Sequence, residues 1–265
     1  MKKHIVLYFI LYNFLDNVDE YVQASEKINS VNLEPKDNND CANFSNQHAK
    51  SFTEIGKNIC EQFLKLYKSL PNLKNNISNG SCSKKNCGFL NYWLNFELKK
   101  HNQNTCVNVF HNGIESQCNN TIDNILPNNV IYNIDEDHLY KIDKLYNLYS
   151  NYTKLKAIIG SSLEKDKQER LQLSTKCCAD YNEVSYICKD DNKNNEDNIE
   201  FCEKLDIFKN NYEKLYTQLG EEGSEISNSF KKLTECGNTR IIATAILGSV
   251  AGIIPLMGGL YKVKN

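Results

Sequence analysis

The sequence predicts an all-α protein, in which a disulfide-linked helical ectodomain precedes one C-terminal transmembrane helix. Apolar residues recur at spacings of three and four through the middle of the chain, whereas no stretch alternates apolar and polar residues for long enough to build a sheet. The 11 cysteines favour a disulfide framework made in an oxidising compartment. An uncharged stretch near the C-terminus has the length of a membrane span. The expected parts are a signal peptide (1–24), the ectodomain (25–239), the transmembrane helix (240–261) and a short cytosolic tail (262–265).

The N-terminal residues have the pattern of a secretory signal peptide. Lys2 and Lys3 provide the basic start, and an apolar stretch follows from Ile5 to Leu15. The small residues near Ala24 suit a signal peptidase. The apolar stretch is too short to cross a bilayer, which disfavours a second transmembrane helix. The alternative is an uncleaved apolar helix that packs on the domain.

Two amphipathic helices are expected in the first half of the ectodomain. The first covers residues 52–70 and should end before Pro71, because proline cannot continue a helix. The second covers residues 88–98 and follows a loop rich in Asn, Ser and Lys. Their apolar positions are Phe52, Ile55, Ile59, Phe63, Leu66, Tyr67 and Leu70 in the first helix, and Leu90, Trp93, Leu94 and Leu98 in the second.

Three adjacent acids, at residues 135–137, precede the next apolar stripe, which runs from Leu139 to Ile159. Such a cluster could serve as a metal site or an acid–base site. Acidic side chains in a first turn also accept hydrogen bonds from free backbone N–H groups and complement the helix dipole. We therefore interpret the three acids as a helix cap.

The second half of the ectodomain is expected to continue as helices. One helix should cover residues 164–188, and a charged loop should follow at 189–198. The clearest stripe in the chain then runs from Ile199 to Leu219 at spacings of three and four. Gly220 and Gly223 bracket two glutamates and indicate a hinge before the last short segment.

The cysteines are the candidate structural sites of the ectodomain. Several lie on the helical stripes, as Cys60 and Cys202 do. A cysteine that faces inward can bond to another helix and add about 2–4 kcal/mol of stability. The pairing stays open, the odd count leaves at least one thiol without an intramolecular partner, and any single cysteine could instead be a buried free thiol. The candidates are Cys41, Cys60, Cys82, Cys87, Cys106, Cys118, Cys177, Cys178, Cys188, Cys202 and Cys236.

Residues 241–261 contain no charged side chain. A helix of that length spans about 31 Å, which matches the hydrocarbon core of a bilayer. Basic residues flank both sides, so the positive-inside rule does not decide the orientation, and the cysteines instead place residues 25–239 on the non-cytosolic side. Gly248 and Gly252 form a GxxxG pattern that allows close helix packing, which suggests a homo-oligomer through this helix. The sequence therefore predicts a single-pass membrane protein.

No catalytic, cofactor-binding or metal-binding residues are predicted. The chain lacks the GxGxxG, P-loop, GxSxG and HExxH motifs. A zinc site that draws on the pairs Cys82–Cys87 and Cys106–His111 is an alternative, but the spacing does not match the usual zinc motif, and His101 and Cys118 give no clean additional ligand. The net charge of −2, from 31 basic and 33 acidic side chains, provides no field that would attract nucleic acid. We therefore expect neither an enzyme nor a nucleic-acid-binding protein.

Four segments carry a family resemblance. The most specific is CGFLNYWLNFEL, at residues 87–98, in which Cys87 precedes a Leu-Asn-Tyr-Trp-Leu motif. The other three are NICEQFLKLYKSL (58–70), DHLYKIDKLYNLYSNYTKL (137–155) and CEKLDIFKNNYEKLY (202–216). Together with the apolar C-terminal stretch, these segments resemble the Plasmodium interspersed repeat family, close to its vir-type members.

The resemblance implies a variant surface antigen of a blood-stage malaria parasite, at the infected red-cell surface or in parasite-derived membranes. Antigenic variation, immune evasion and host-cell adhesion are the roles proposed for the family, and host-cell receptors or antibodies are the implied partners. We expect variable contacts at the loops 74–85 and 189–198. The alternative is a structural or trafficking component of parasite-induced membranes in the infected red cell, which the GxxxG pattern suits. The signal-like start and the short tail depart from the pattern of many family members.

Overall fold

The computed structural model describes residues 11–70, 84–101, 105–119, 122, 131–159, 163–189, 195–222 and 229–235. All regular secondary structure in these ranges is helical, so the all-α part of the predicted fold class is confirmed for them. The elements, in chain order, are η1 (Asn13–Asn17), α2 (Val18–Lys27), η2 (Ile28–Ser30), α3 (Pro35–His48), α4 (Thr53–Ser69), α5 (Lys84–Lys100), α6 (Val107–Gln117), α7 (Glu136–Ile158), α8 (Glu164–Val184), η4 (Ser185–Cys188) and α9 (Glu196–Glu222).

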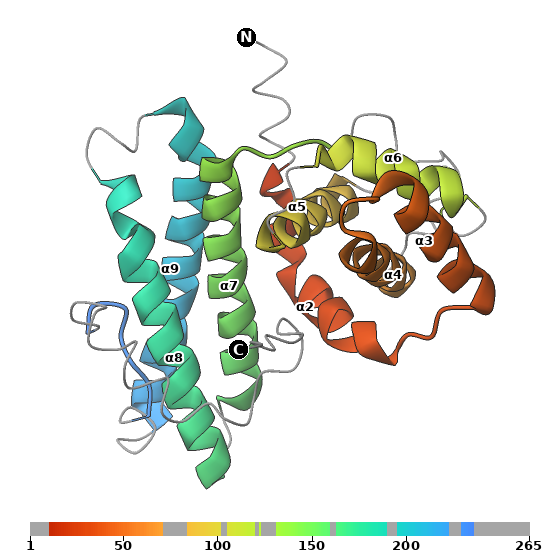
Figure 1. Ribbon diagram of the computed structural model, residues 1–265. Coiled ribbons are helices and arrows are strands. Elements are labelled where there is room, and N and C mark those ends of the chain that lie inside the picture. The colour runs from red at the N-terminus through yellow and green to blue at the C-terminus, as the bar shows by residue number, and fades with distance from the viewer. Residues whose placement is uncertain are drawn as a thin grey trace, which may run out of the picture.

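The helices form two groups that meet along α7 (Figure 1). In one group, α7, α8 and α9 lie side by side, with α7 in contact with both of the others. In the other group, α3 packs on α4, α6 packs on α3, and α5 contacts both α4 and α7. Helix α2 contacts α4 on one side and α7 on the other, so it joins the two groups.

The predicted C-terminal transmembrane helix, and the single-pass membrane location that follows from it, are corrected by the structure. Among the helices that the structure describes, none combines the length and the apolar character that crossing a bilayer requires. The physical reason is clear in the longest ones: α7 and α9, of 23 and 27 residues, carry charged side chains throughout their length. The stretch 240–261, with Gly248 and Gly252, lies outside the described residues.

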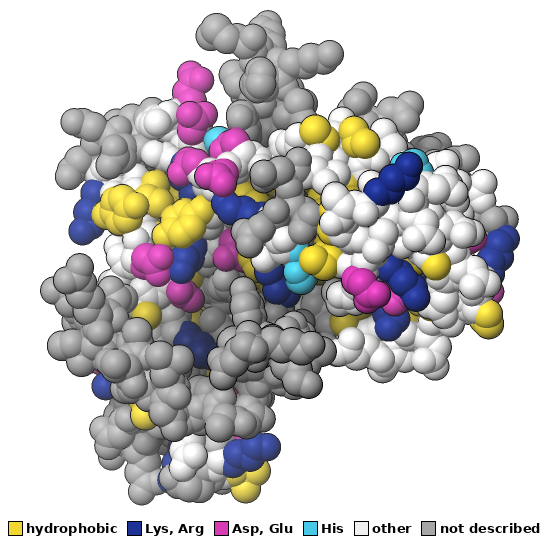
Figure 2. All heavy atoms as spheres, viewed as in Figure 1, with side chains coloured by type: hydrophobic (Ala, Val, Ile, Leu, Met, Phe, Trp, Pro, Cys, Tyr) yellow, Lys and Arg dark blue, Asp and Glu magenta, His cyan; other side chains and the backbone are white. Residues whose placement is uncertain are grey.

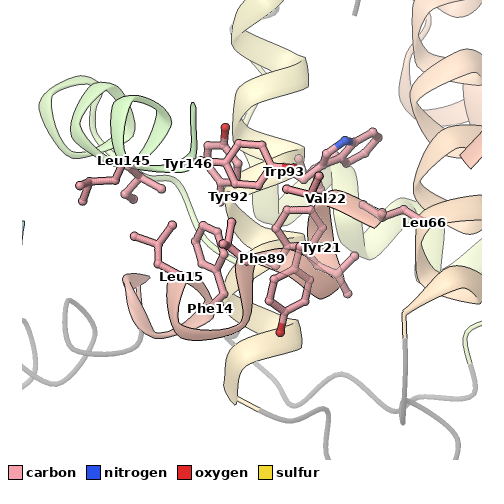
Figure 3. Close-up of a cluster of buried hydrophobic side chains, with 14 of the residues drawn as sticks. Phe14, Leu15, Tyr21, Val22, Leu66, Phe89, Tyr92, Trp93, Leu145 and Tyr146 are labelled. Carbon is pink, nitrogen blue, oxygen red and sulfur yellow. The ribbon is translucent and has the colours of Figure 1, made fainter. Parts of the chain in front are cut away.

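The centre of the core is a cluster of aromatic rings that joins the two groups of helices (Figure 3). Phe14 of η1 stacks on Tyr92 of α5, with 5.5 Å between ring centroids, and Tyr21 of α2 stacks on Phe89 at 4.5 Å. Tyr146 of α7 lies 5.3 Å from Tyr92. All five side chains are buried. Offset and tilted ring pairs of this kind add about 0.5–1.5 kcal/mol each beyond the burial of apolar area.

The N-terminal segment is therefore part of the core. Between residues 11 and 24, the apolar side chains are buried, and Phe14 is 0% exposed. For residues 11–15, the described part of the predicted apolar stretch, this is the arrangement of the alternative interpretation, in which the segment packs on the domain. The first ten residues lie outside the described ranges, and cleavage after Ala24 stays a prediction.

The interpretation of the acids before α7 as a cap is confirmed at Asp135. Its side chain accepts a hydrogen bond from the backbone N–H of His138 at 3.0 Å. Burial tends to raise the pKa of Asp135, but the hydrogen bonds from His138 outweigh it and lower the pKa below its usual range.

Helices α3 and α6 were not predicted. Helix α3 is rich in Asn and has few apolar residues, so its sequence shows no clear stripe. Its start is instead fixed by a capping box between Glu34 and Asp37, with Pro35 in the first turn. Buried Cys41 and Phe44 then hold α3 against α4 and α6. Helix α9 also continues through Gly220, where a hinge was predicted.

Candidate functional site

A groove runs between the two groups of helices and encloses about 810 Å³. It is called here the α5–α7 groove. One wall is the face of α5 with Phe89, Tyr92, Trp93 and Phe96, which recur at the spacings of three and four that place side chains on one side of a helix. The opposite wall is α7, and α2 and α8 contribute to the ends. The lining residues of α7 are Tyr146, Asn147, Ser150, Asn151, Lys154, Ala157 and Ile158.

Polar contacts join the walls of the groove below its aromatic surface. The Tyr92 hydroxyl donates a hydrogen bond to Asp143 of α7 at 2.9 Å, and Asn147 donates to the same carboxylate at 3.2 Å. Burial raises the pKa of Asp143 despite these hydrogen bonds, and it raises the pKa of Tyr146 to about 12. At the rim, Lys154 pairs with Glu26 of α2 at 3.0 Å. The Tyr92–Asp143 and Lys154–Glu26 contacts therefore hold α5 and α2 against α7 along the groove.

The structure places the candidate cysteines in several different states. Cys41 and Cys60 form a disulfide between α3 and α4, and Cys188 and Cys202 form one between η4 and α9. The two other described cysteines that are disulfide-bonded are Cys87 and Cys178. The free thiols among the described residues are Cys106, Cys118 and Cys177, and the candidates Cys82 and Cys236 lie outside the described ranges.

Three sulfur atoms meet where α3, α4 and α6 converge, and they are called here the sulfur cluster. The Sγ of the free thiol Cys118 lies 3.9 Å from the Sγ of Cys60, and the sulfurs of Cys41, Cys60 and Cys118 all lie within 4.8 Å of one another. All three residues are 0% exposed. Metal ions bind thiolates, so with two of the sulfurs in a disulfide this cluster offers one ligand and does not fit a metal in the oxidised state.

The zinc alternative weighed from the sequence is not assembled in the described residues. Cys87 is disulfide-bonded, and Cys106 is exposed whereas His111 is buried. His111 lies edge-on to the ring of Phe63, and burial lowers its pKa to about 4. The imidazole is therefore neutral at pH 7, although the Glu115 carboxylate lies 3.7 Å away.

The buried side chain of Arg170 has a structural role that the sequence did not predict. Arg170 of α8 is 0% exposed, and its guanidinium donates to the backbone carbonyls of Ile158 at 3.3 Å and Ile159 at 3.4 Å. These carbonyls end α7, where a positive charge complements the helix dipole. A lone arginine within a polar helix carries no signal for this role in the sequence, because the role depends on how α8 packs on α7.

Comparison with known proteins gives no match to a family model, to a curated protein or to a solved structure.

Proposed function

We propose that the chain is a variant antigen of the Plasmodium interspersed repeat kind, a protein without catalytic chemistry whose exterior is recognised by host receptors or antibodies. The observation that carries the proposal concerns the four segments that bear the resemblance. They coincide with α4, α5, α7 and α9, the helices that supply much of the interior. Leu64, Leu94, Leu145 and Phe208, one from each helix, are all 0% exposed.

This arrangement suits a protein whose surface changes while its fold is retained. Substitutions on an exposed surface usually alter stability by less than about 0.5 kcal/mol, whereas loss of a buried Leu or Phe costs about 2–5 kcal/mol. Disulfides within each group of helices, such as Cys41–Cys60 and Cys188–Cys202, add stability that further offsets the cost of surface substitutions. The exposed parts of the chain can then differ between copies at little cost to folding.

The α5–α7 groove is the recognition site that fits this function, and its occupant is an extended segment of a host protein with an apolar anchor. From Tyr146 to Ile158, the α7 wall runs for about 18 Å, which is the length of about five or six extended residues. On the α5 wall, the partly exposed ring of Phe96 offers contact to an apolar side chain, whereas Phe89, Tyr92 and Trp93 behind it are buried. Asn147 and Asn151 on the opposite wall can hydrogen-bond the backbone of the bound segment.

The test uses the purified full chain with its disulfides formed. Binding is measured to red cells and to antibodies in serum from hosts that carry blood-stage parasites. We expect the oxidised protein to bind both, and Ser150→Trp, which places an indole in the groove, to lower cell binding at least tenfold. The matched control is Glu213→Trp on α9, which does not line the groove and should leave binding within twofold.

Absence of binding to cells and to serum antibodies would refute the proposed function. Equal cell binding by the two Trp variants would refute the groove as the recognition site. The thermal midpoint of each variant is measured in parallel, so that loss of folding is separated from loss of contact. The alternative role in parasite-induced membranes depended on the C-terminal span, and no observation among the described residues favours it.

A further inference from the structure

The sulfur cluster is held in a fixed geometry by three helices. Cys60 lies in the middle of α4 and Cys41 in α3, and their disulfide ties the two helices together. Cys118 follows the last residue of α6, and its backbone N–H donates to the carbonyl of Ile114 at 2.7 Å. The free thiol is therefore anchored by the end of a helix, with its sulfur 3.9 Å from the sulfur of Cys60.

We propose that the sulfur cluster is a thiol–disulfide exchange centre, in which Cys118 can replace Cys41 as the bonding partner of Cys60. When the end of α6 opens locally, the buried Cys118 thiol gives its proton to the solvent that enters, and the thiolate sulfur attacks Sγ of Cys60. A Cys60–Cys118 bond forms as the Cys41–Cys60 bond breaks. The electron pair leaves on Sγ of Cys41, which takes up a proton. One disulfide and one thiol are present before and after, so no outside oxidant or reductant is needed.

The position of Cys118 distinguishes it from the other free thiols of the described residues. Cys106 is exposed at the opposite end of α6. Cys177 is buried in α8, and its sulfur lies 3.9 Å from the carbonyl oxygen of Leu148. For Cys118, in contrast, the neighbouring atom is itself half of a disulfide. Thiol–disulfide exchange depends on access of the thiol to that sulfur, and here the fold holds the two sulfur atoms 3.9 Å apart, so that a movement at the end of α6 can bring Cys118 in line with the Cys41–Cys60 bond.

The surroundings of the cluster keep the exchange slow in the native state. Burial, together with the nearby charges of Asp40 and Asp37, raises the pKa of the Cys118 thiol to about 12. Asp37 is paired with Lys68 of α4, with 2.5 Å between nitrogen and oxygen. Because only the thiolate attacks, exchange should speed up as pH rises or when the end of α6 opens locally.

Exchange would move a covalent tie from one helix pair to another. The present bond joins α3 to α4, which also contact each other along their lengths and share the Asp37–Lys68 ion pair. The alternative bond joins α4 to the end of α6. Helix α3 would therefore stay in place through its other contacts, while α6 would gain a covalent anchor that it lacks in the structure.

The experiment uses the full chain and maps disulfides by proteolysis and mass spectrometry without reduction. The Cys41→Ala variant leaves Cys60 and Cys118 as neighbours, and we expect it to form the Cys60–Cys118 bond in a glutathione redox buffer. In the wild-type protein held at pH 8.5 with a trace of reduced glutathione, the same bond should appear beside Cys41–Cys60. The Cys118→Ala variant should abolish it, whereas Cys106→Ala, which removes the exposed thiol, should leave its yield within twofold.

Recovery of Cys60 and Cys118 as free or glutathione-capped thiols in folded Cys41→Ala protein would overturn the proposal. If Cys41→Ala does not fold, the wild-type experiment decides alone. In that case, a Cys60–Cys118 peptide fraction that stays below detection after equilibration is the overturning result.

Discussion

The burial of the N-terminal segment makes a strong prediction about its removal. Deletion of residues 1–24, as cleavage after Ala24 would produce, should leave a chain that does not fold. Besides Ala24, seven larger apolar side chains would be lost from the core, each at most 5% exposed. At about 1.5–3 kcal/mol for each, the loss is roughly 10–20 kcal/mol, an upper estimate because the unfolded chain also buries some apolar area. The side chains are Leu11, Tyr12, Phe14, Leu15, Val18, Tyr21 and Val22.

That loss is comparable to the whole free energy of unfolding of a typical protein, which is about 5–15 kcal/mol. The assay is circular dichroism with thermal unfolding, with limited proteolysis as a second measure of folding. The deleted chain should show no cooperative transition and should be cut within the helical core.

A point substitution tests the same reasoning on a chain of full length. Phe14→Ala should cost about 3–5 kcal/mol, because it removes a ring that contacts both α2 and α5. For a chain of this size the thermal midpoint should fall by about 6–20 °C. The matched control is Gln23→Ala, an exposed position in α2, which should change stability by less than about 0.5 kcal/mol. A deleted chain with the wild-type midpoint, or equal effects of the two substitutions, would refute the account of the core.

Three further predictions concern buried polar groups. Arg170→Ala should lower the free energy of unfolding by about 2–4 kcal/mol in urea titrations, because the carbonyls at the end of α7 lose their donor. Arg170→Lys should lower it by less. Equal losses in the two variants would show that the guanidinium geometry is unimportant. The low pKa of His111 means that the unfolded chain binds a proton at a higher pH than the folded chain. Stability should therefore fall as pH drops from about 6.5 to about 4, by about 3 kcal/mol in total, and His111→Gln should lack this component in denaturation measured at each pH. The Asn95 side-chain amide donates to the carbonyl of Tyr132 and accepts from the N–H of Ile134, both at 2.9 Å. Asn95→Ala should therefore lower the free energy of unfolding by about 2–4 kcal/mol and speed hydrogen exchange at the Ile134 amide. Unchanged exchange at Ile134 would contradict this role.

The helices with regular apolar stripes could be predicted from the sequence, and those held by long-range contacts could not. Helices α4, α7 and α9 bury most of the apolar residues that recur along them, because one buried face is enough to produce the spacing, although Ile199 at the start of the α9 stripe is exposed. Helix α3 shows no such stripe, since a disulfide and a few ring contacts hold it in place. The N-terminal apolar stretch looks the same in sequence whether it is cleaved or packed. Only its neighbours in space distinguish the two cases.

The α5–α7 groove and the sulfur cluster also could not be predicted from the sequence. Of the aromatic residues of α5 that line the groove, only Trp93 belonged to the predicted apolar stripe, and the position of α7 opposite them decides that they face a groove. The sequence marked Cys41, Cys60 and Cys118 as candidates without indicating which would pair. Their meeting depends on α3, α4 and α6 converging at one point, which no spacing along the chain reveals.

The partners of Phe14 also set the order in which the protein can be completed during synthesis. Tyr146 emerges from the ribosome 132 residues after Phe14, which at about 5–20 residues per second corresponds to a delay of about 7–25 s. During that interval the apolar start of the chain has no finished pocket to enter. Any factor that binds nascent apolar segments would have those seconds to act before α7 arrives and the segment is enclosed.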